Sequence, residues 1–166
     1  YLDLELESPP PKSAEKLLNR VLPEGLGVIS VKPLLRGSTS LFKTIDCALF
    51  RVEIPLDMAP DFDASLEELF SREKVPYRRR KKVVNLLDYH RNHQLSRRGE
   101  VWQLDMLLQC NPRGSGRPDE FLKALGIPAG EVFNIPILRR ELLIARNGDY
   151  FDPMGSRRGN WEDLIS

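Results

Sequence analysis

The sequence has little that could anchor a metal or cross a membrane. Its 166 residues include two cysteines, Cys47 and Cys110, which lie too far apart for a CxxC pair. A zinc knuckle and a dithiol redox motif are therefore excluded. No stretch approaches the ~20 apolar residues that span a bilayer, and no signal-like apolar run follows a basic start. We expect a cytoplasmic protein with two free thiols, no cofactor and no membrane partner.

An excess of charge of one sign is also missing. The chain has 25 Lys and Arg against 24 Asp and Glu, a net charge of +1, which excludes a globally basic nucleic-acid binder. Charge is nevertheless sorted along the chain. Residues 52–70 contain acidic side chains without any Lys or Arg, whereas residues 71–98 are dominated by Lys and Arg. Either these neighbours neutralise one another across adjacent elements, or a local basic patch binds an anionic partner.

No catalytic signature is present. We find no Ser-His-Asp arrangement, no marked partner for a cysteine nucleophile and no patterned carboxylate pair, so we expect no catalytic centre. The only histidines, His90 and His93, have Asp88 nearby. In a strand or turn their rings would diverge, and no third strong ligand is evident. We therefore predict surface histidines and no metal site.

The first forty residues predict a β-α-β unit. Alternating leucines and acids indicate a half-buried strand at 1–7, Ser13 can cap a helix with one apolar face, and a second strand follows at 27–31. The polar, turn-rich segment 36–40 predicts a boundary. Residues 1–40 are thus expected to be part of a second ferredoxin-like unit, and a chain that begins inside a strand is expected to be a fragment.

Residues 41–146 predict a complete domain. A short helical connection leads into a strand near 48–55. A helix capped by Asp63 or Ser65 follows, with Leu66, Leu69 and Phe70 on one face. The basic run is then expected to form a strand of the sheet that turns near Lys82. In the next strand Trp102, Leu104, Met106 and Leu108 share one face, with Gln103 and Asp105 opposite.

A second helix and a last strand complete this domain. The helix begins at Pro118 and stops at Gly126. Pro136 within the last strand indicates a sheet edge. The order β-α-β-β-α-β predicts an α+β protein with a ferredoxin-like sandwich. Residues 147–166 lack periodicity, and we expect a mobile tail.

The stretch "VPYRRRKKVV" carries five consecutive cations. In an extended chain Tyr77, Arg79 and Lys81 point to one side and Arg78, Arg80 and Lys82 to the other. One set can meet RNA or another polyanion, or the run can be a solvated edge strand whose charges prevent sheet pairing. Tyr77 and Trp102 are the only candidates for base stacking, which favours contact with the RNA backbone over base readout.

The stretch "NPRGSGRPDEF" is a second candidate. Gly114 and Gly116, flanked by Arg113 and Arg117, can present amide groups and cations to a phosphate. It is not a P-loop, because the Lys-Ser/Thr pair is absent. Acidic residues already occupy the first turn of the helix, which favours a well-capped helix after a flexible loop.

Several segments together resemble a known family. "YLDLELE", "LLNRVLPEGLGVISVKPL", "VPYRRRKKVV", "GSGRPDEFLKALG" and "ILRRELLI" are similar to the bacterial radical-SAM-linked protein family, a domain of unknown function found beside or fused to a B12-binding-type radical SAM protein. The resemblance implies a longer N-terminus, radical chemistry that resides in the partner, and an RNA target. It carries over to Arg78 through Lys82, to Asp88, and to the run from Arg117 to Glu120.

We therefore expect a non-catalytic accessory domain of a radical SAM protein that binds RNA. The expected contact residues are Arg78, Arg79, Arg80, Lys81 and Lys82, joined by Arg113 and Arg117. The first alternative is a protein-interaction module whose basic strand docks on an acidic face of the radical SAM partner. The second is an enzyme whose site is shared with a missing N-terminal part.

Overall fold

The computed structural model describes residues 1–34 and 37–166. The chain divides into two compact units, Tyr1–Leu41 and Phe42–Ser166. The boundary expected at 36–40 lies partly outside the described residues, because Leu35 and Arg36 are not among them.

The first unit contains the predicted helix but not the predicted strands. Helix α1 (Ala14–Val21) begins after Ser13, whose side chain makes no capping bond. Segments 1–7 and 27–31 form no strand, and neither is paired in a sheet. Asn19 of α1 exchanges two hydrogen bonds with the backbone of Val28, at 2.9 and 2.6 Å. No side chain in residues 1–34 and 37–41 is buried, so the alternating pattern near the start has no partner strand there.

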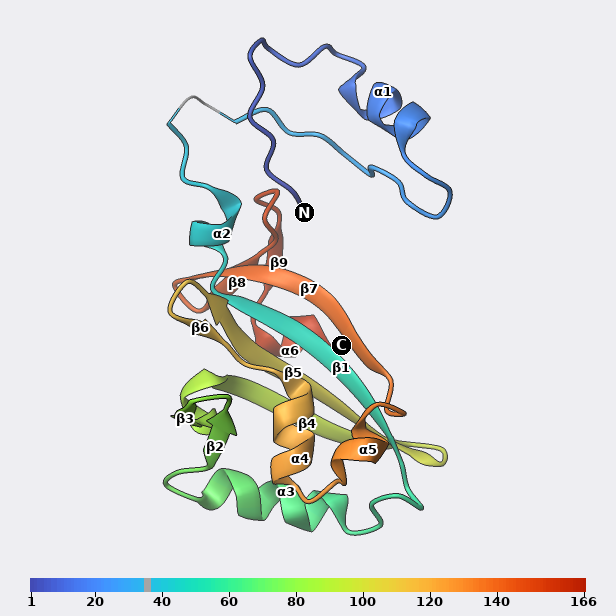
Figure 1. The fold of residues 1–166 in the computed structure, drawn as a ribbon, viewed down its shortest axis with the longest axis vertical. Coiled ribbons are helices and arrows are strands. Elements are labelled where there is room, and N and C mark those ends of the chain that lie inside the picture. Colours follow the sequence, from blue (N-terminus) through green and yellow to red (C-terminus); the bar gives the residue numbers. More distant parts are fainter. Residues whose placement is uncertain (35–36) are drawn as a thin grey trace. The chain divides into compact units, whose positions relative to one another are not determined.

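The second unit is built on one antiparallel sheet (Figure 1). Its strand order β4-β5-β1-β7, with α3 after β1 and α4 after β5, is that of a ferredoxin-like sandwich and confirms the predicted α+β fold. The short helix α2 (Leu41–Thr44) precedes β1. The strands of this order are β1 (Cys47–Pro55), β4 (His90–Arg98), β5 (Val101–Asn111) and β7 (Ile137–Arg146), and the helices are α3 (Phe62–Ser71), α4 (Pro118–Ala124) and α5 (Ala129–Val132).

The main core lies between the sheet and these helices. Val52 and Ile54 of β1 are fully buried there, as are alternate residues of β5. Each such Val, Leu or Ile side chain stabilises the fold by roughly 1.5–3 kcal/mol. The predicted face of β5 is confirmed, as is the apolar stripe of α3, although α3 begins after Asp61 and not at Asp63 or Ser65. The side chains from β5 and the helices are Leu104, Met106, Leu108, Phe62, Leu66, Leu69, Phe121 and Leu122.

The segment expected to be a mobile tail contains regular structure. β8 (Asp149–Phe151) pairs with β7 across an Asn147–Gly148 turn, β9 (Arg157–Gly159) pairs with β8, and α6 (Trp161–Ile165) follows. Leu164 of α6 is buried against the sheet face opposite the main core. Asn147 and Gly148 both have positive φ, as a two-residue hairpin turn requires. The Asn147–Gly148 dipeptide is therefore the signal in the sequence that indicates a hairpin here in place of a mobile tail.

Two expectations about the sheet are wrong. The basic run does not belong to it, because β2 (Pro76–Arg79) and β3 (Lys82–Asn85) pair only with each other. Pro136 does not mark an edge, because it precedes β7, which lies between β1 and β8. The proline carbonyl accepts a hydrogen bond from Glu53 N at 3.2 Å. In the described parts of the chain, no helix has the length and apolar character needed to span a bilayer.

Candidate nucleic-acid interface

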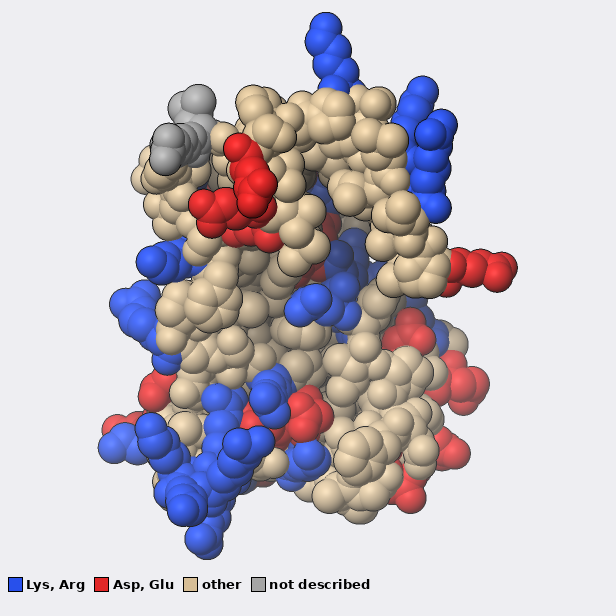
Figure 2. Space-filling view, turned by 45° about the horizontal axis from the view of Figure 1, so that its top comes forward, with Lys and Arg blue, Asp and Glu red and all other residues tan. Residues whose placement is uncertain are grey.

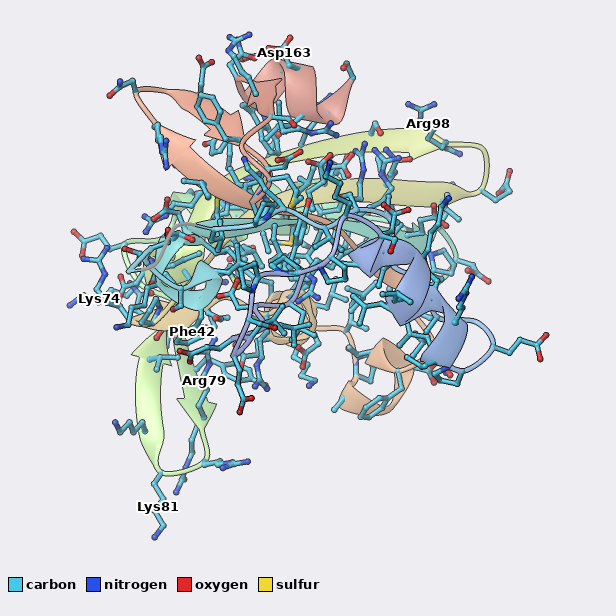
Figure 3. All side chains as sticks on the ribbon, turned by 90° about the horizontal axis from the view of Figure 1, so that it is seen from above. Phe42, Lys74, Arg79, Lys81, Arg98 and Asp163 are labelled. Atoms are coloured by element: carbon cyan, nitrogen blue, oxygen red, sulfur yellow. The ribbon has the colours of Figure 1, made fainter. Side chains whose placement is uncertain are left out.

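The basic run forms a hairpin that projects from the second unit (Figure 3). The register pairs Arg79 with Lys82, which leaves a two-residue loop of Arg80 and Lys81. Such loops require positive φ and favour Gly or Asn. Arg80 nevertheless adopts φ 50°, a conformation that costs a non-glycine residue about 1–3 kcal/mol and is often retained where function needs the side chain.

In β2 the strand places neighbouring side chains on opposite sides, and the turn at Arg80 and Lys81 then ends this alternation. In β2 the side chains of Tyr77 and Arg79 are half-buried, whereas Arg78 is exposed. Arg80, Lys81 and Lys82 are all exposed. The expectation that Lys81 shares the side of Arg79 is therefore wrong, because the chain reverses at Arg80 and Lys81 and not at Lys82. We call Arg78, Arg80, Lys81 and Lys82 the tip cations.

Arg79 is held by the body of the domain. Its Nε donates to both carboxylate oxygens of Glu120, at 2.8 and 3.0 Å, and its Nη2 donates to Glu120 and to the Ser115 carbonyl at 2.9 Å. The guanidinium carbon lies 4.5 Å from the centre of the Tyr89 ring. The hydrogen bonds that it donates to the buried Glu120 carboxylate raise the pKa of Arg79 further above its ordinary value. Arg79 therefore anchors the hairpin and is not available to a phosphate.

Further hydrogen bonds clamp the base of the hairpin. The Asn85 side-chain oxygen accepts a hydrogen bond from Val75 N at 2.8 Å, and Leu86 N donates to the Val75 carbonyl at 2.9 Å. The Asn85 amide nitrogen donates to Asp88 at 2.9 Å, so Asp88, which the resemblance singled out, has a structural role. Val75 and Leu86 are buried. We call Val75, Arg79, Asn85 and Glu120 the hairpin base.

The tip cations lack acidic partners. The sequence from Lys74 to Leu87 contains no Asp or Glu, and none of the ion pairs in residues 1–34 and 37–166 involves a tip cation. Figure 2 shows Lys and Arg gathered on a lobe at the lower left, where Figure 1 places β2 and β3. Exposed like charges at this spacing repel one another by a few tenths of a kcal/mol per pair.

Arg113 and Arg117 flank the hairpin base. The strand β6 (Gly114–Ser115) folds back on the end of β5, and its Ser115 is the residue whose carbonyl accepts from Arg79. Both arginines lie two residues from Ser115 and are exposed. Arg117 is also the residue before α4, which starts with Pro118 as predicted. The Arg79 side chain therefore brings together the two stretches that the sequence offers as candidate sites, residues 75–84 and 111–121.

Three further cations of the basic segment 71–98 lie in other places. Arg97 and Arg98 pair with the start of β5, and Figure 3 shows Arg98 on the side opposite Lys81. Arg91 donates to Gln109 and lines a pocket with Arg113, Asp46, Tyr150 and the buried Cys47. Arg91 thus extends the group containing Arg113, whereas Arg97 and Arg98 do not belong to it.

The buried thiol in this pocket is not a nucleophile. Burial, reinforced by the nearby Asp46 carboxylate, raises the pKa of Cys47 to about 12, so the thiol stays protonated at neutral pH. Cys110 is half-buried, and both cysteines are free.

The histidines are half-buried and not exposed at the surface as predicted. A β-bulge between His90 and Asn92 turns both rings to the same side, where His90 Nε2 lies 3.0 Å from His93 Nδ1. Both rings pack on Phe70, with centroids 4.2 and 4.1 Å from its own. Burial, and then the neighbouring His93, lower the pKa of His90 to about 4, and burial also lowers the pKa of His93. Within residues 1–34 and 37–166, no cluster of three or more His, Cys, Asp or Glu suits a metal.

The aromatic rings near the hairpin already have packing partners. Tyr77 packs against the main core. Trp102, the other predicted stacking residue, lies at the end of β5 away from the hairpin, in register with Arg97, and donates its indole N–H to the Ala59 carbonyl at 3.1 Å. Tyr89 lies beneath Arg79. The site therefore presents cations and backbone groups, and these three rings do not provide a stacking platform.

Comparison with known proteins gives one match. A family model described as "Uncharacterized protein conserved in bacteria (DUF2344)" matches residues 1–118. No curated protein and no solved structure matches the chain. The matched range includes the hairpin, Arg113 and Arg117, and it ends at Pro118, the first residue of α4.

Proposed function

The chain belongs to this family of uncharacterized bacterial proteins, and we propose that it is a non-catalytic accessory module that binds RNA through the tip cations. The observation that carries the proposal is the contrast within the hairpin. Arg79 is neutralised by Glu120, whereas four neighbouring cations extend into solvent without an acidic partner. An uncompensated cluster on a fixed scaffold favours an anionic ligand, and a nucleic-acid backbone supplies regularly spaced charges.

We further propose that the module serves a radical SAM protein, either fused to it or separate. This part of the proposal rests on the family resemblance of the sequence segments. The two cysteines of this chain cannot supply the three thiolates that such an enzyme uses to hold its iron–sulfur cluster. In this arrangement the partner performs the radical chemistry, and the hairpin presents the RNA.

A binding titration with matched variants tests the RNA proposal. We expect the Lys81→Gln/Lys82→Gln variant to bind RNA at least tenfold more weakly in fluorescence anisotropy. Its log-log salt slope should be shallower by about 0.7 to 0.9 for each phosphate that is no longer neutralised. The control is Arg97→Gln/Arg98→Gln, which removes the same charge from the other end of β4. Equal weakening in both variants, or no salt-sensitive binding by the unaltered chain, would overturn the proposal.

One observation favours a second candidate, docking on an acidic face of the radical SAM partner. Val83 lies beside the tip cations, across from Arg78, and its side chain is 71% exposed. An apolar side chain ringed by cations is typical of a protein interface. A pull-down of the radical SAM partner that survives nuclease treatment, and is abolished in Val83→Ser as well as in Lys81→Gln/Lys82→Gln, would favour docking over RNA binding.

A further inference from the structure

Arg79 connects the hairpin to the β5–β6 turn, and we propose that the two together form one basic surface whose ligand is helical RNA, held through the phosphates of a stem. This inference rests on the proposed function and names the kind of RNA that the site would take. Three features carry it: the continuity of the surface, its rigidity, and the positions of the nearby rings.

The Arg79 guanidinium joins the hairpin to the β5–β6 turn. Arg79 Nη2 donates to the Ser115 carbonyl at 2.9 Å. Arg113 and Arg117 each lie two residues from Ser115, so their Cα atoms are within about 7 Å of it. Lys81 likewise lies two residues beyond Arg79 on the other side. The tip cations and the two arginines therefore all lie within two or three residues of the contact between Arg79 and Ser115.

Close packing holds the two halves in a fixed relation. The Tyr89 ring lies between Arg79 and β6, and a Cβ added to Gly114 would come within 2.7 Å of the ring atom Cε1. Gly114 has φ 144°, which further disfavours any other residue there. The buried Arg79–Glu120 pair adds a bidentate contact with α4. A preorganised surface loses little conformational entropy when its ligand is rigid as well.

The nearby rings are already engaged, which separates helical from single-stranded RNA. Proteins that hold single strands place successive bases on free aromatic faces. Here Tyr77 packs against the core and Tyr89 lies under Arg79, and Trp102 lies at the other end of β5, in register with Arg97. A stem keeps its bases stacked internally and presents phosphates and 2′-hydroxyl groups. Cations and exposed backbone groups are the chemistry that this surface offers.

The number of cations sets the expected salt dependence. Four tip cations and two flanking arginines allow up to six phosphate contacts. On a duplex each contact contributes about −0.9 to the slope of log K against log salt, so a slope between about −3 and −5 is expected. Because the contacts avoid base edges, the affinity should be nearly independent of stem sequence.

The test compares an RNA stem with its two unpaired strands at equal length, using fluorescence anisotropy with the full chain. We expect at least tenfold tighter binding to the stem, and less than a twofold change when the stem sequence is scrambled. Equal or tighter binding to the unpaired strands would overturn the helical-RNA inference and leave RNA binding by the tip standing. Failure to bind any RNA would overturn both.

A second pair of variants tests the extent of the surface. Arg113→Gln/Arg117→Gln should weaken stem binding about tenfold and make the salt slope shallower by roughly 2, one contact per arginine. Arg97→Gln/Arg98→Gln should leave the stem affinity within twofold. Circular dichroism of all variants checks that they are folded. Unchanged stem binding by Arg113→Gln/Arg117→Gln would overturn the continuous surface.

Discussion

The base and the tip of the same hairpin use arginine in opposite ways. At the base, Arg79 is half-buried, doubly hydrogen-bonded to Glu120 and stacked on Tyr89. One residue away on either side, Arg78 and Arg80 are exposed, and neither has an acidic partner among the residues that the structure describes. Residue type therefore does not decide the role. A cation paired with a buried carboxylate anchors the hairpin, whereas an exposed cation without such a partner is available to bind a ligand.

The two regions also differ in what a substitution should change. Removing a base residue leaves a buried charge or polar group without its partner, which reduces stability. Removing a tip cation relieves repulsion and alters only the field around the hairpin. Substitutions in the hairpin base should therefore change stability, and substitutions of the tip cations should change RNA affinity. The two sets lie in the same hairpin, except Glu120, which contacts it.

The largest expected effect is at Glu120. Glu120→Ala leaves the Arg79 guanidinium partly buried and uncompensated, and we expect it to lower the free energy of unfolding by about 3–5 kcal/mol. Urea denaturation followed by circular dichroism measures this. The hairpin should lose its anchor in the same variant, so the backbone amides of 76–85 should exchange with solvent faster.

Asp119 provides the matched control for this prediction. It occupies the same first turn of α4, but its pair with Lys123 lies at the surface. Asp119→Ala should cost less than about 1 kcal/mol, since exposed pairs of this kind contribute little. Similar destabilisation at the two positions would mean that the Arg79–Glu120 pair does not hold the base.

The sequence predicts those parts of the molecule whose pattern is local. The 3.6-residue period of α3 and the alternation of β5 each reflect one buried face, which can be recognised within about ten residues. The Arg79–Glu120 pair cannot be recognised in that way, because its partners are 41 residues apart and meet only after the sheet has formed. The hairpin turn is misplaced by the sequence pattern because Arg80 and Lys81 carry no glycine or asparagine signal.

The histidines show a second limit. A strand without a bulge would place residues three apart on opposite faces. The β-bulge between His90 and Asn92 adds one residue, and that shift brings both rings onto Phe70. Bulges arise from pairing between strands, so the pattern within one strand does not predict them.

An intermediate effect is expected from His90, which begins β4 just after the hairpin base. The pKa of His90 is about 4 in the folded chain against an ordinary 6.5, so the unfolded chain binds the proton first as the pH falls. Its contribution to stability is complete above about pH 6.5 and is lost as the pH falls toward about 4. Partial solvent access to the ring makes a decrease of about 2 kcal/mol reasonable.

The measurement is urea unfolding between pH 7 and pH 4.5, with His90→Phe as the comparison. Phenylalanine keeps a ring on Phe70 and removes the titrating group, so the variant should lose less stability on acidification by about 2 kcal/mol. Carboxylates and His93, whose pKa is lowered by its own burial, titrate in both proteins, so the difference between the two curves reports on His90 and its contact with His93. If the free energy of unfolding changed equally with pH in both proteins, His90 would be excluded as the source of the lost stability.

The smallest expected effect lies at the tip, where stability and binding should move in opposite directions. Arg80→Gly relieves the positive φ of a non-glycine residue, although glycine's greater freedom in the unfolded chain offsets part of the gain. We expect the free energy of unfolding to rise by at most about 1 kcal/mol, while RNA affinity falls and the salt slope becomes shallower by the amount expected for one phosphate. Lys81→Gln removes the same charge without relieving that strain, so it should weaken RNA binding similarly without the gain in stability. If Arg80→Gly instead left RNA affinity unchanged, the strained turn would not be explained by ligand binding, and Arg80 would have to be removed from the contact surface.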